Sequence, residues 1–193
     1  MHTLFVTDGI VLQKRGVGEA NVLAVILTEE LGLVRALARS ARAEKSKLRY
    51  GLEPLSRGTF SLIRGKYEWK LVGAEQMSSA YLAPVVARRH IAARATRLLL
   101  RLINGEEPMP ALYQTVLRGL AALVQAQTQS QEDALECVLV LRILSHLGYL
   151  PNTPELSPFV VSDEFGRELA ARALKARATL VRSINESLGA TGL

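Results

Sequence analysis

The chain has 193 residues, of which 49% are hydrophobic and 22% are charged. This length and composition are enough to bury one large core or two small ones, and they exclude a disordered polyelectrolyte. The net charge of +6 and the pI near 9.8 favour an anionic partner, although many proteins use a basic pI only to stay soluble. Most of the surplus lies early, because residues 1–76 hold 12 Lys and Arg against 8 Asp and Glu.

The longest apolar runs, such as Val22 to Leu27, are far shorter than the ~20 residues that a membrane-spanning helix needs. The amino terminus lacks the succession of basic, apolar and small residues of a secretory signal. The single cysteine, Cys137, cannot form a disulfide within the chain. We therefore expect no membrane partner and a cytoplasmic location.

Up to about residue 76, short runs of β-branched and aromatic residues are separated by glycines and charged turns, which is typical of a small all-β unit. Gly65 predicts a tight hairpin before the last run. Five strands with a longer excursion after the third predict a small closed barrel, and the OB-fold is the commonest such barrel that handles nucleic acid. The strands are expected at residues 3–13, 21–28, 33–39, 56–64 and 66–75.

The excursion contains the stretch "ARSARAEKSKLRYG", residues 38–51, which sets five cations against one anion, Glu44. Arg35 shares parity with the first of these cations on the third strand, so both are expected on one face of the barrel. Such a track attracts phosphates because each cation that displaces a counterion gains binding free energy without reading a base. The alternative is a solvated loop that only prevents edge pairing. The five cations are Arg39, Arg42, Lys45, Lys47 and Arg49.

Four more cations on the next two strands would widen this track into a groove for a single strand: Arg57, Arg64, Lys66 and Lys70. Single-strand binding also needs aromatic platforms on which bases stack. Tyr50, at the end of the cationic stretch, is the predicted stacking residue. Trp69 alternates with charged residues and is expected to face the core instead.

From about residue 83 the apolar residues follow helical spacing, with Pro84 near the first helix start and Pro110 at the second. Ser130 and Asp133 predict a capping box for a third helix, which is apolar almost all round and should be central. A last helix is expected from about Arg167 to Leu188.

Strands first and helices after predict an α+β chain with its junction near residues 77–83. We expect an OB-fold nucleic-acid-binding domain over residues 1–80 and an α-helical bundle domain for partner docking over residues 81–193. On the first helix, His90, Arg94, Arg97 and Arg101 lie on one side, where they either extend the anion track or are simply solvated.

The sequence contains no recognisable catalytic or cofactor motif. No two of its three histidines have the spacing of a helical metal site, and a single cysteine excludes zinc held by thiolates of one chain. Cys137 and His146 both lie on the apolar third helix, where an inert core thiol and a packed, hydrogen-bonded imidazole are expected. Phosphate-loop and dinucleotide motifs are absent. We expect no enzymatic activity, no cofactor and no metal.

A series of short motifs lies between residues 9 and 66, and "LRILSHLGYLP" (141–151) follows at the end of the third predicted helix. The motifs in the first region are Gly9 to Leu12, Gly18-Glu19, Thr28-Glu29-Glu30 with Gly32, Ala38 to Arg42, Lys45 to Leu48 and Leu52 to Leu55. Together they resemble the family of the bacterial DNA repair protein RecO.

The resemblance implies an OB-fold followed by a helical domain, without enzymatic turnover, in a recombination mediator associated with the nucleoid. Such proteins bind single- and double-stranded DNA, anneal complementary strands and help to load recombinase onto DNA coated with single-stranded DNA-binding protein. The implied partners are RecR and the acidic tail of single-stranded DNA-binding protein. The family's basic motif falls on the five cations of residues 39–49, and Arg118 and Arg142, on neighbouring predicted helices, are the candidates for the tail.

One segment and one residue depart from the family pattern. Many members carry a four-cysteine zinc module after the "LGYxP" helix, whereas "NTPELSPFVVSDEF" has no cysteine, so no metal is carried over. Ser40 stands where the family usually has Gly. A protein–protein adaptor whose basic loop binds acidic peptides is the alternative function, and an enzyme with an unrecognised carboxylate pair is a third.

Overall fold

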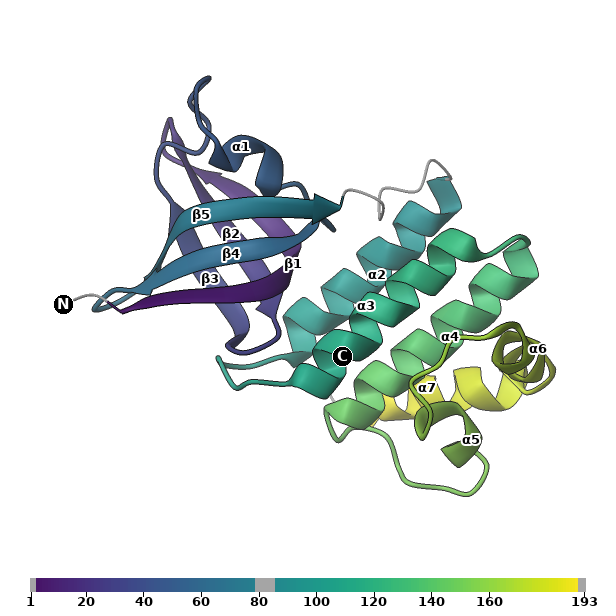
Figure 1. The fold of residues 1–193 in the computed structure, drawn as a ribbon. Coiled ribbons are helices and arrows are strands. Elements are labelled where there is room, and N and C mark those ends of the chain that lie inside the picture. Colours follow the sequence, from purple (N-terminus) through teal and green to yellow (C-terminus); the bar gives the residue numbers. More distant parts are fainter. Residues whose placement is uncertain (1–2, 79–85, 191–193) are drawn as a thin grey trace. The chain divides into compact units, whose positions relative to one another are not determined.

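A computed structural model of the chain describes residues 3–78 and 86–190 (Figure 1). The chain forms two compact units. One unit comprises Met1–Pro84 together with Ile103–Tyr113, and the other comprises Val85–Leu102 and Gln114–Leu193. Most of the junction that the sequence predicts near residues 77–83, with Pro84, lies outside the described residues.

Five strands of the first unit close into a barrel in the order β1-β2-β3-β5-β4. The β3–β5 pair is parallel, and the other four pairs, including β1 with β4, are antiparallel. The predicted five-stranded barrel is therefore confirmed. The strands are β1 (Leu4–Val17), β2 (Asn21–Thr28), β3 (Gly32–Ala38), β4 (Arg57–Arg64) and β5 (Trp69–Ser78).

Alternating residues of these strands fill the barrel, since successive side chains of a strand point to opposite faces. The core includes Ile26, Phe60 and Leu62, all fully buried. Trp69 is 4% exposed and meets Phe5 edge-on at 5.3 Å between ring centroids, so its predicted inward orientation is confirmed.

The end of β1 and both ends of β5 differ from the predicted boundaries by three or four residues, with β5 ending at Ser78 and not at residue 75. β1 continues to Val17 because its last residues pair with β2, from Lys14 opposite Ala24 to Val17 opposite Asn21. β5 begins at Trp69, because the β4–β5 turn occupies residues 65–68 and is closed by the Gly65 N–H, which donates to the Glu68 carbonyl. The glycine turns of the sequence therefore predicted the hairpins but not their lengths.

The excursion between β3 and β4 contains a short helix, α1 (Leu48–Gly51), that the sequence did not predict. Leu52 is 1% exposed and, with half-buried Leu48, packs against the barrel core. A Cβ on Gly51 would lie 2.9 Å from the Cβ of Ala74 on β5, so only glycine allows this close approach. The cationic stretch is thus anchored to the barrel by apolar contacts on both sides of Tyr50.

Further helices follow the barrel, and α4 is the central one of the second unit, in contact with α2, α5, α6 and α7 (Figure 1). Leu139, Leu141 and Leu144 of α4 are fully buried, which confirms the predicted central position. Pro110 begins α3, as predicted. The helices are α2 (Val86–Leu102), α3 (Pro110–Gln125), α4 (Gln129–His146), α5 (Ser157–Val160), α6 (Arg167–Lys175) and α7 (Arg177–Ala190).

Two predicted helix boundaries are wrong. The N-cap of α4 is Thr128, whose hydroxyl accepts a hydrogen bond from the Gln131 N–H at 3.2 Å, so the cap lies two residues before Ser130. The expected last helix is divided at Ala176 into α6 and α7. Both pieces pack on α4, and each has buried residues of its own, such as Ala173 in α6 and Leu180 in α7. Neither Gly nor Pro marks the break in the sequence.

Candidate nucleic-acid interface

The cationic stretch leaves β3 through a turn that is tied to the β1–β2 connection. The Ser40 N–H donates to Asn21 Oδ1 at 2.9 Å, and the Arg42 N–H donates to the Ala20 carbonyl at 2.9 Å. Ser40 has a φ of +51°, in the left-handed region that glycine adopts without steric cost. This conformation explains why a glycine would suit position 40, and hydrogen bonding to Asn21 holds the serine there.

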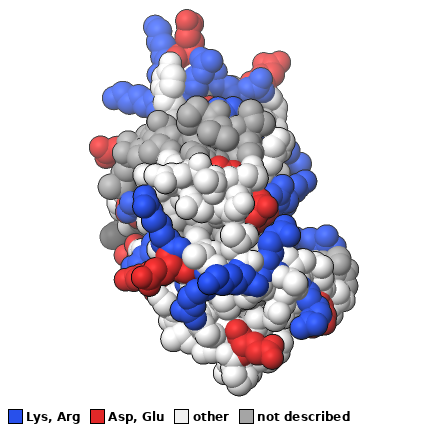
Figure 2. Space-filling view, turned by 90° about the vertical axis from the view of Figure 1, so that its right-hand side faces the viewer, with Lys and Arg blue, Asp and Glu red and all other residues white. Residues whose placement is uncertain are grey.

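The side chains of Arg39, Arg42, Lys45, Lys47 and Arg49, here called the basic segment, are all exposed. In the part of the chain that the structure describes, none of them forms an ion pair with a carboxylate. Figure 2 shows Lys and Arg side chains gathered at the top of the view, where Figure 1 places α1 and the loop before it. The structure therefore brings these five predicted residues together on one exposed stretch of the barrel.

Arg35 and Lys70 lie on the neighbouring strands β3 and β5. Arg35 is exposed on β3, and Lys70 is half-buried on β5, where it pairs with Leu37 of β3. Ala36 and Ala38, which alternate with the outward residues of β3, are buried in the barrel. The predicted parity of β3 is thus confirmed: its cation points outward while its alanines point inward.

Arg57 is held by a polar cluster and does not extend the track. Its Nη2 lies 3.2 Å from Asp8 Oδ2, and Thr59 Oγ1 donates to Asp8 Oδ1 at 2.9 Å. Burial alone would lower the pKa of Arg57, but Tyr113 and Asp8 outweigh it and raise that pKa. Burial in turn raises the pKa of the Tyr113 hydroxyl. Arg57 therefore serves the packing of residues 103–113 within the barrel unit, contrary to the prediction from its sequence position.

Arg64 and Lys66 flank the β4–β5 turn, and each contacts an aromatic ring. Arg64 pairs with Glu106 at 3.1 Å, and its guanidinium carbon lies 5.1 Å from the centre of the Trp69 ring. Lys66 Nζ lies 5.0 Å from the centre of the Tyr67 ring. Arg64 is thus partly neutralised, whereas Lys66 keeps its charge next to an aromatic residue.

Two tyrosines of the barrel unit are largely exposed to solvent. Tyr50, the predicted stacking residue, is 70% exposed. Tyr67 is 87% exposed, and sequence reasoning missed it because it placed residue 67 inside β5, where it would share the inward parity of Trp69. Its position after Gly65 in a tight hairpin was the available signal.

Lys14 and Arg15 on β1 are two further exposed cations that sequence reasoning did not assign. They line a cleft together with Arg42 and Arg49 of the basic segment. The sequence separates the two pairs by more than 25 residues, and the long β1–β2 ladder and the hydrogen bond between Arg42 and Ala20 help to bring them together.

Arg142, one of the two predicted partner contacts, is inside the helical unit. It is 1% exposed; its Nε donates to the Phe159 carbonyl at 2.7 Å and its Nη2 donates to the Glu164 carbonyl at 3.0 Å. Its guanidinium also lies 4.4 Å from the centre of the Phe165 ring, and burial lowers its pKa. Arg142 therefore holds residues 159–165 against α4 and is not accessible to a partner. Arg118 is exposed on α3, 3.8 Å from Asp163.

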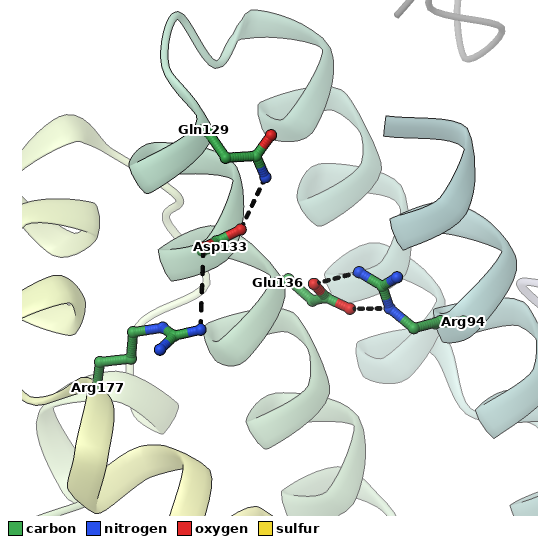
Figure 3. Close-up of polar contacts among 5 residues, drawn as sticks. All are labelled: Arg94, Gln129, Asp133, Glu136 and Arg177. Atoms are coloured by element: carbon green, nitrogen blue, oxygen red, sulfur yellow. Dashed lines mark hydrogen bonds and ion pairs between the residues drawn. The ribbon is translucent and has the colours of Figure 1, made fainter. Parts of the chain in front are cut away.

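The arginine side of α2 is partly engaged by α4 (Figure 3). Arg94 forms two hydrogen bonds with Glu136, at 2.5 and 2.6 Å, and this pair raises the pKa of Arg94. On the same helix α4, Asp133 accepts a hydrogen bond from Gln129 at 2.8 Å and lies 3.9 Å from Arg177 of α7. Arg97 and Arg101 are exposed. Arg94 thus links α2 to α4 within the helical unit.

The remaining titratable groups do not assemble a metal or membrane site in the described residues. No group of three or more His, Cys, Asp or Glu side chains there could hold a metal ion. None of the described helices has the length and hydropathy required to cross a bilayer. His146 Nε2 lies 2.8 Å from Thr115 Oγ1, and burial raises the pKa of the Cys137 thiol. The predicted hydrogen bond of His146 is confirmed, but the residue is exposed at the end of α4 and not packed in the core, and Cys137 is half-buried.

The strand order, the helix between β3 and β4 and the helical unit define the chain as an OB-fold protein with an attached helical domain. Two family models match it: "Recombination protein O N terminal" over residues 1–77 and "Recombination protein O C terminal" over residues 87–155. The chain belongs to the RecO family of DNA repair proteins.

Several curated proteins named "DNA repair protein RecO" are similar to the chain. The protein of Heliobacterium modesticaldum is 32% identical over 149 residues, which cover 77% of this chain and 53% of the relative. That of Bifidobacterium adolescentis is 32% identical over 168 residues, covering 83% and 65%. That of Dehalococcoides mccartyi is 30% identical over 152 residues, covering 78% and 59%. The chain thus spans between about half and two thirds of the length of these relatives.

Proposed function

We propose that this chain is a recombination mediator that binds single- and double-stranded DNA through the phosphates and promotes annealing of complementary strands. The observation that carries the proposal is the basic segment, whose five exposed cations form no ion pair in the described part of the chain. Family membership supports DNA as the polyanion. The residues proposed to contact DNA are the basic segment, Tyr50, Arg35, Arg64, Lys66 and Lys70.

Annealing follows from neutralisation of two strands on one surface. Two DNA strands repel each other through their phosphates, and a cationic surface that holds both removes much of this repulsion. Phosphate contacts carry no base information and leave the bases free to pair. The exposed rings of Tyr50 and Tyr67 add stacking that favours unpaired bases. No bond is made or broken in this process, so the proposed activity is not enzymatic.

The partners proposed for the chain come from the family resemblance. They are RecR and the acidic tail of single-stranded DNA-binding protein, through which the chain helps to load recombinase onto coated DNA. Arg118 on α3 is the accessible cation proposed to meet the tail in the helical domain. A pull-down of each purified partner by the chain tests these contacts, and failure of both removes this part of the proposal.

The DNA proposal predicts a large effect of three cations that have no described hydrogen bond or ion pair. Replacing Arg39, Lys45 and Lys47 together by Ala should weaken single-strand binding and slow annealing. Loss of three phosphate contacts should reduce the slope of log K against log salt by about 2 for a single strand. The measurement is fluorescence anisotropy with a labelled oligonucleotide at several salt concentrations, with an annealing assay on the same protein.

A charge-matched control separates a local site from net charge. Replacing Arg167, Lys175 and Arg182, exposed cations of α6 and α7, by Ala removes the same charge from the helical domain. This control should keep the wild-type affinity and slope. Equal losses in both variants would show that the basic segment is not a site. Weak binding of wild type, unaffected by either change, would favour the protein–protein adaptor.

A further inference from the structure

A cleft of about 620 Å³ opens on the barrel between the last part of β1 and the segment that carries α1. Four cations stand at its rim: Lys14 and Arg15 from β1, and Arg42 and Arg49 from the basic segment. Its volume falls within the range of about 300–1,000 Å³ that holds one small ligand. The cleft therefore has the charge and the size to hold one anionic unit of a polymer. The exposed part of the basic segment beside it offers charge without such an enclosed space.

The floor of this cleft is apolar. Val22, Ala41 and Leu52 are between 1% and 8% exposed, and all three also belong to the barrel core. A bare inorganic anion gains nothing from such a floor, because its affinity comes from charge and hydrogen bonds alone. A ligand with a charged group and a flat or apolar part uses both the rim and the floor. A nucleotide has this composition.

Arg42 is positioned over the cleft before any ligand binds. Its Nη1 lies 3.3 Å from the Gly18 carbonyl oxygen, and its backbone is fixed by the hydrogen bond to Ala20. A Cβ on Gly16 would lie 3.2 Å from that same Nη1, so the guanidinium crosses β1 where no side chain stands. Gly16 does not have a positive φ, so its backbone conformation also suits larger residues. A larger side chain at this position would occupy the space that now holds the guanidinium of Arg42.

One carboxylate shares the rim. Glu53 Oε1 accepts a hydrogen bond from Lys14 Nζ at 2.6 Å, with side chains 49% and 35% exposed. This pair holds the segment after α1 against β1, and it offsets one of the four positive charges. An exposed pair of this kind contributes little to stability and can exchange for a phosphate.

We propose that this cleft is a subsite for one unpaired nucleotide of a DNA strand, with its phosphate bound by Arg42 and its neighbours and its sugar or base against Val22, Ala41 and Leu52. The inference rests on the proposed function, and it adds Lys14, Arg15 and Gly16 to the residues proposed to contact DNA. A paired nucleotide in a duplex keeps its base in the stack, so it cannot reach rim and floor together. The subsite thereby favours single strands over duplexes.

A neutral substitution tests the shape of the cleft without changing its charge. Gly16→Val places a branched side chain under Arg42 and suits a strand by its β-propensity. Anisotropy titration should show an affinity for a single-stranded oligonucleotide that is lower by about fivefold or more, since one base contact is lost. The salt slope and the affinity for duplex DNA should not change. Gln13→Val, an exposed change on the same strand outside the cleft, is the matched control and should bind like wild type.

A second variant should change the affinity for single-stranded DNA in the opposite direction. Glu53→Gln frees Lys14 and should tighten single-strand binding, with a salt slope steeper by about 0.7. Thermal melts of each variant establish that it is folded. If wild type binds DNA and neither variant changes that binding, the subsite is wrong and the proposed function stands. If wild type binds no DNA, the proposed function is wrong. Loss of duplex and single-strand affinity in equal measure in Gly16→Val would also overturn the subsite.

Discussion

The guanidinium of Arg142 is a cation inside the helical unit whose described hydrogen bonds go to two carbonyl oxygens, of Phe159 and Glu164. Burying a charge is costly unless it is hydrogen-bonded, and charge-assisted bonds contribute about twice as much as neutral ones. The two bonds and the Phe165 ring hold a stretch that has little regular structure of its own. Arg142 therefore fixes residues 159–165 to α4 through side-chain contacts, since these residues form few regular backbone hydrogen bonds of their own.

Arg142→Met keeps most of the side-chain volume and removes both hydrogen bonds. We expect a loss of about 2 kcal/mol in the free energy of unfolding, because two carbonyl groups lose their donor. Urea denaturation followed by circular dichroism measures it. Arg118→Met, which breaks a 3.8 Å pair between exposed groups, should change stability by less than about 0.5 kcal/mol. Equal stability of both variants would mean that the cost of burying the charge cancels its bonds.

Residue type alone does not separate these arginines. Arg39, Arg57 and Arg142 look alike in the sequence, yet Arg39 is exposed, Arg57 is half-buried beside Asp8 and Arg142 is fully buried. What distinguishes them is a partner far along the chain, such as Asp8 for Arg57. Parity along a strand predicted the outward Arg35 and the inward Trp69, because it depends on neighbouring residues only.

At the scale of elements, the N-terminus of α4 allows the predicted cap and the observed one to be compared. Thr128→Ala removes the hydroxyl that accepts from Gln131 and should cost about 1 kcal/mol. Ser130→Ala lies within the first turn, is exposed, and should be neutral or slightly stabilising by helix propensity. Thermal or urea unfolding of the two variants side by side decides between them. A larger loss for Ser130→Ala would restore the cap that the sequence predicted.

The elements themselves were largely predictable, and the errors have local physical causes. Strong alternation and glycine turns identified all five strands, and Pro110 identified the start of α3. Helix α1 was missed because four residues are too few to show a helical repeat of apolar side chains. Its conformation is stabilised by packing of Gly51 on Ala74 and of Leu48 and Leu52 on the barrel core. The division at Ala176 was missed because the residues on both sides of it are good helix formers, although both helices pack on α4.

At the scale of the whole chain, the barrel unit includes a segment that follows α2 in the sequence, Ile103–Tyr113. No local pattern predicts this return, because the residues that meet are far apart in the sequence, such as Arg64 with Glu106 and Gly32 with Glu107. Tyr113 joins the Arg57 and Asp8 cluster, and the backbone of Glu107 approaches the turn between β2 and β3 at Gly32. The division into domains at residues 1–80 and 81–193 remains a proposal. It places Ile103–Tyr113 in the helical domain, whereas these residues pack in the barrel unit.

The contact at Gly32 gives this arrangement a direct test. Gly32 has a φ of +70°, and a Cβ there would lie 2.1 Å from the Glu107 carbonyl oxygen. Gly18 has a similar φ of +60° but open space around its Cβ position. Gly18→Ala should therefore cost about 1 kcal/mol for its backbone conformation alone, whereas Gly32→Ala should cost clearly more, about 3 kcal/mol, because the returning segment must also shift. Urea unfolding of both variants isolates the difference, and equal losses would mean that residues 103–113 do not pack on this turn.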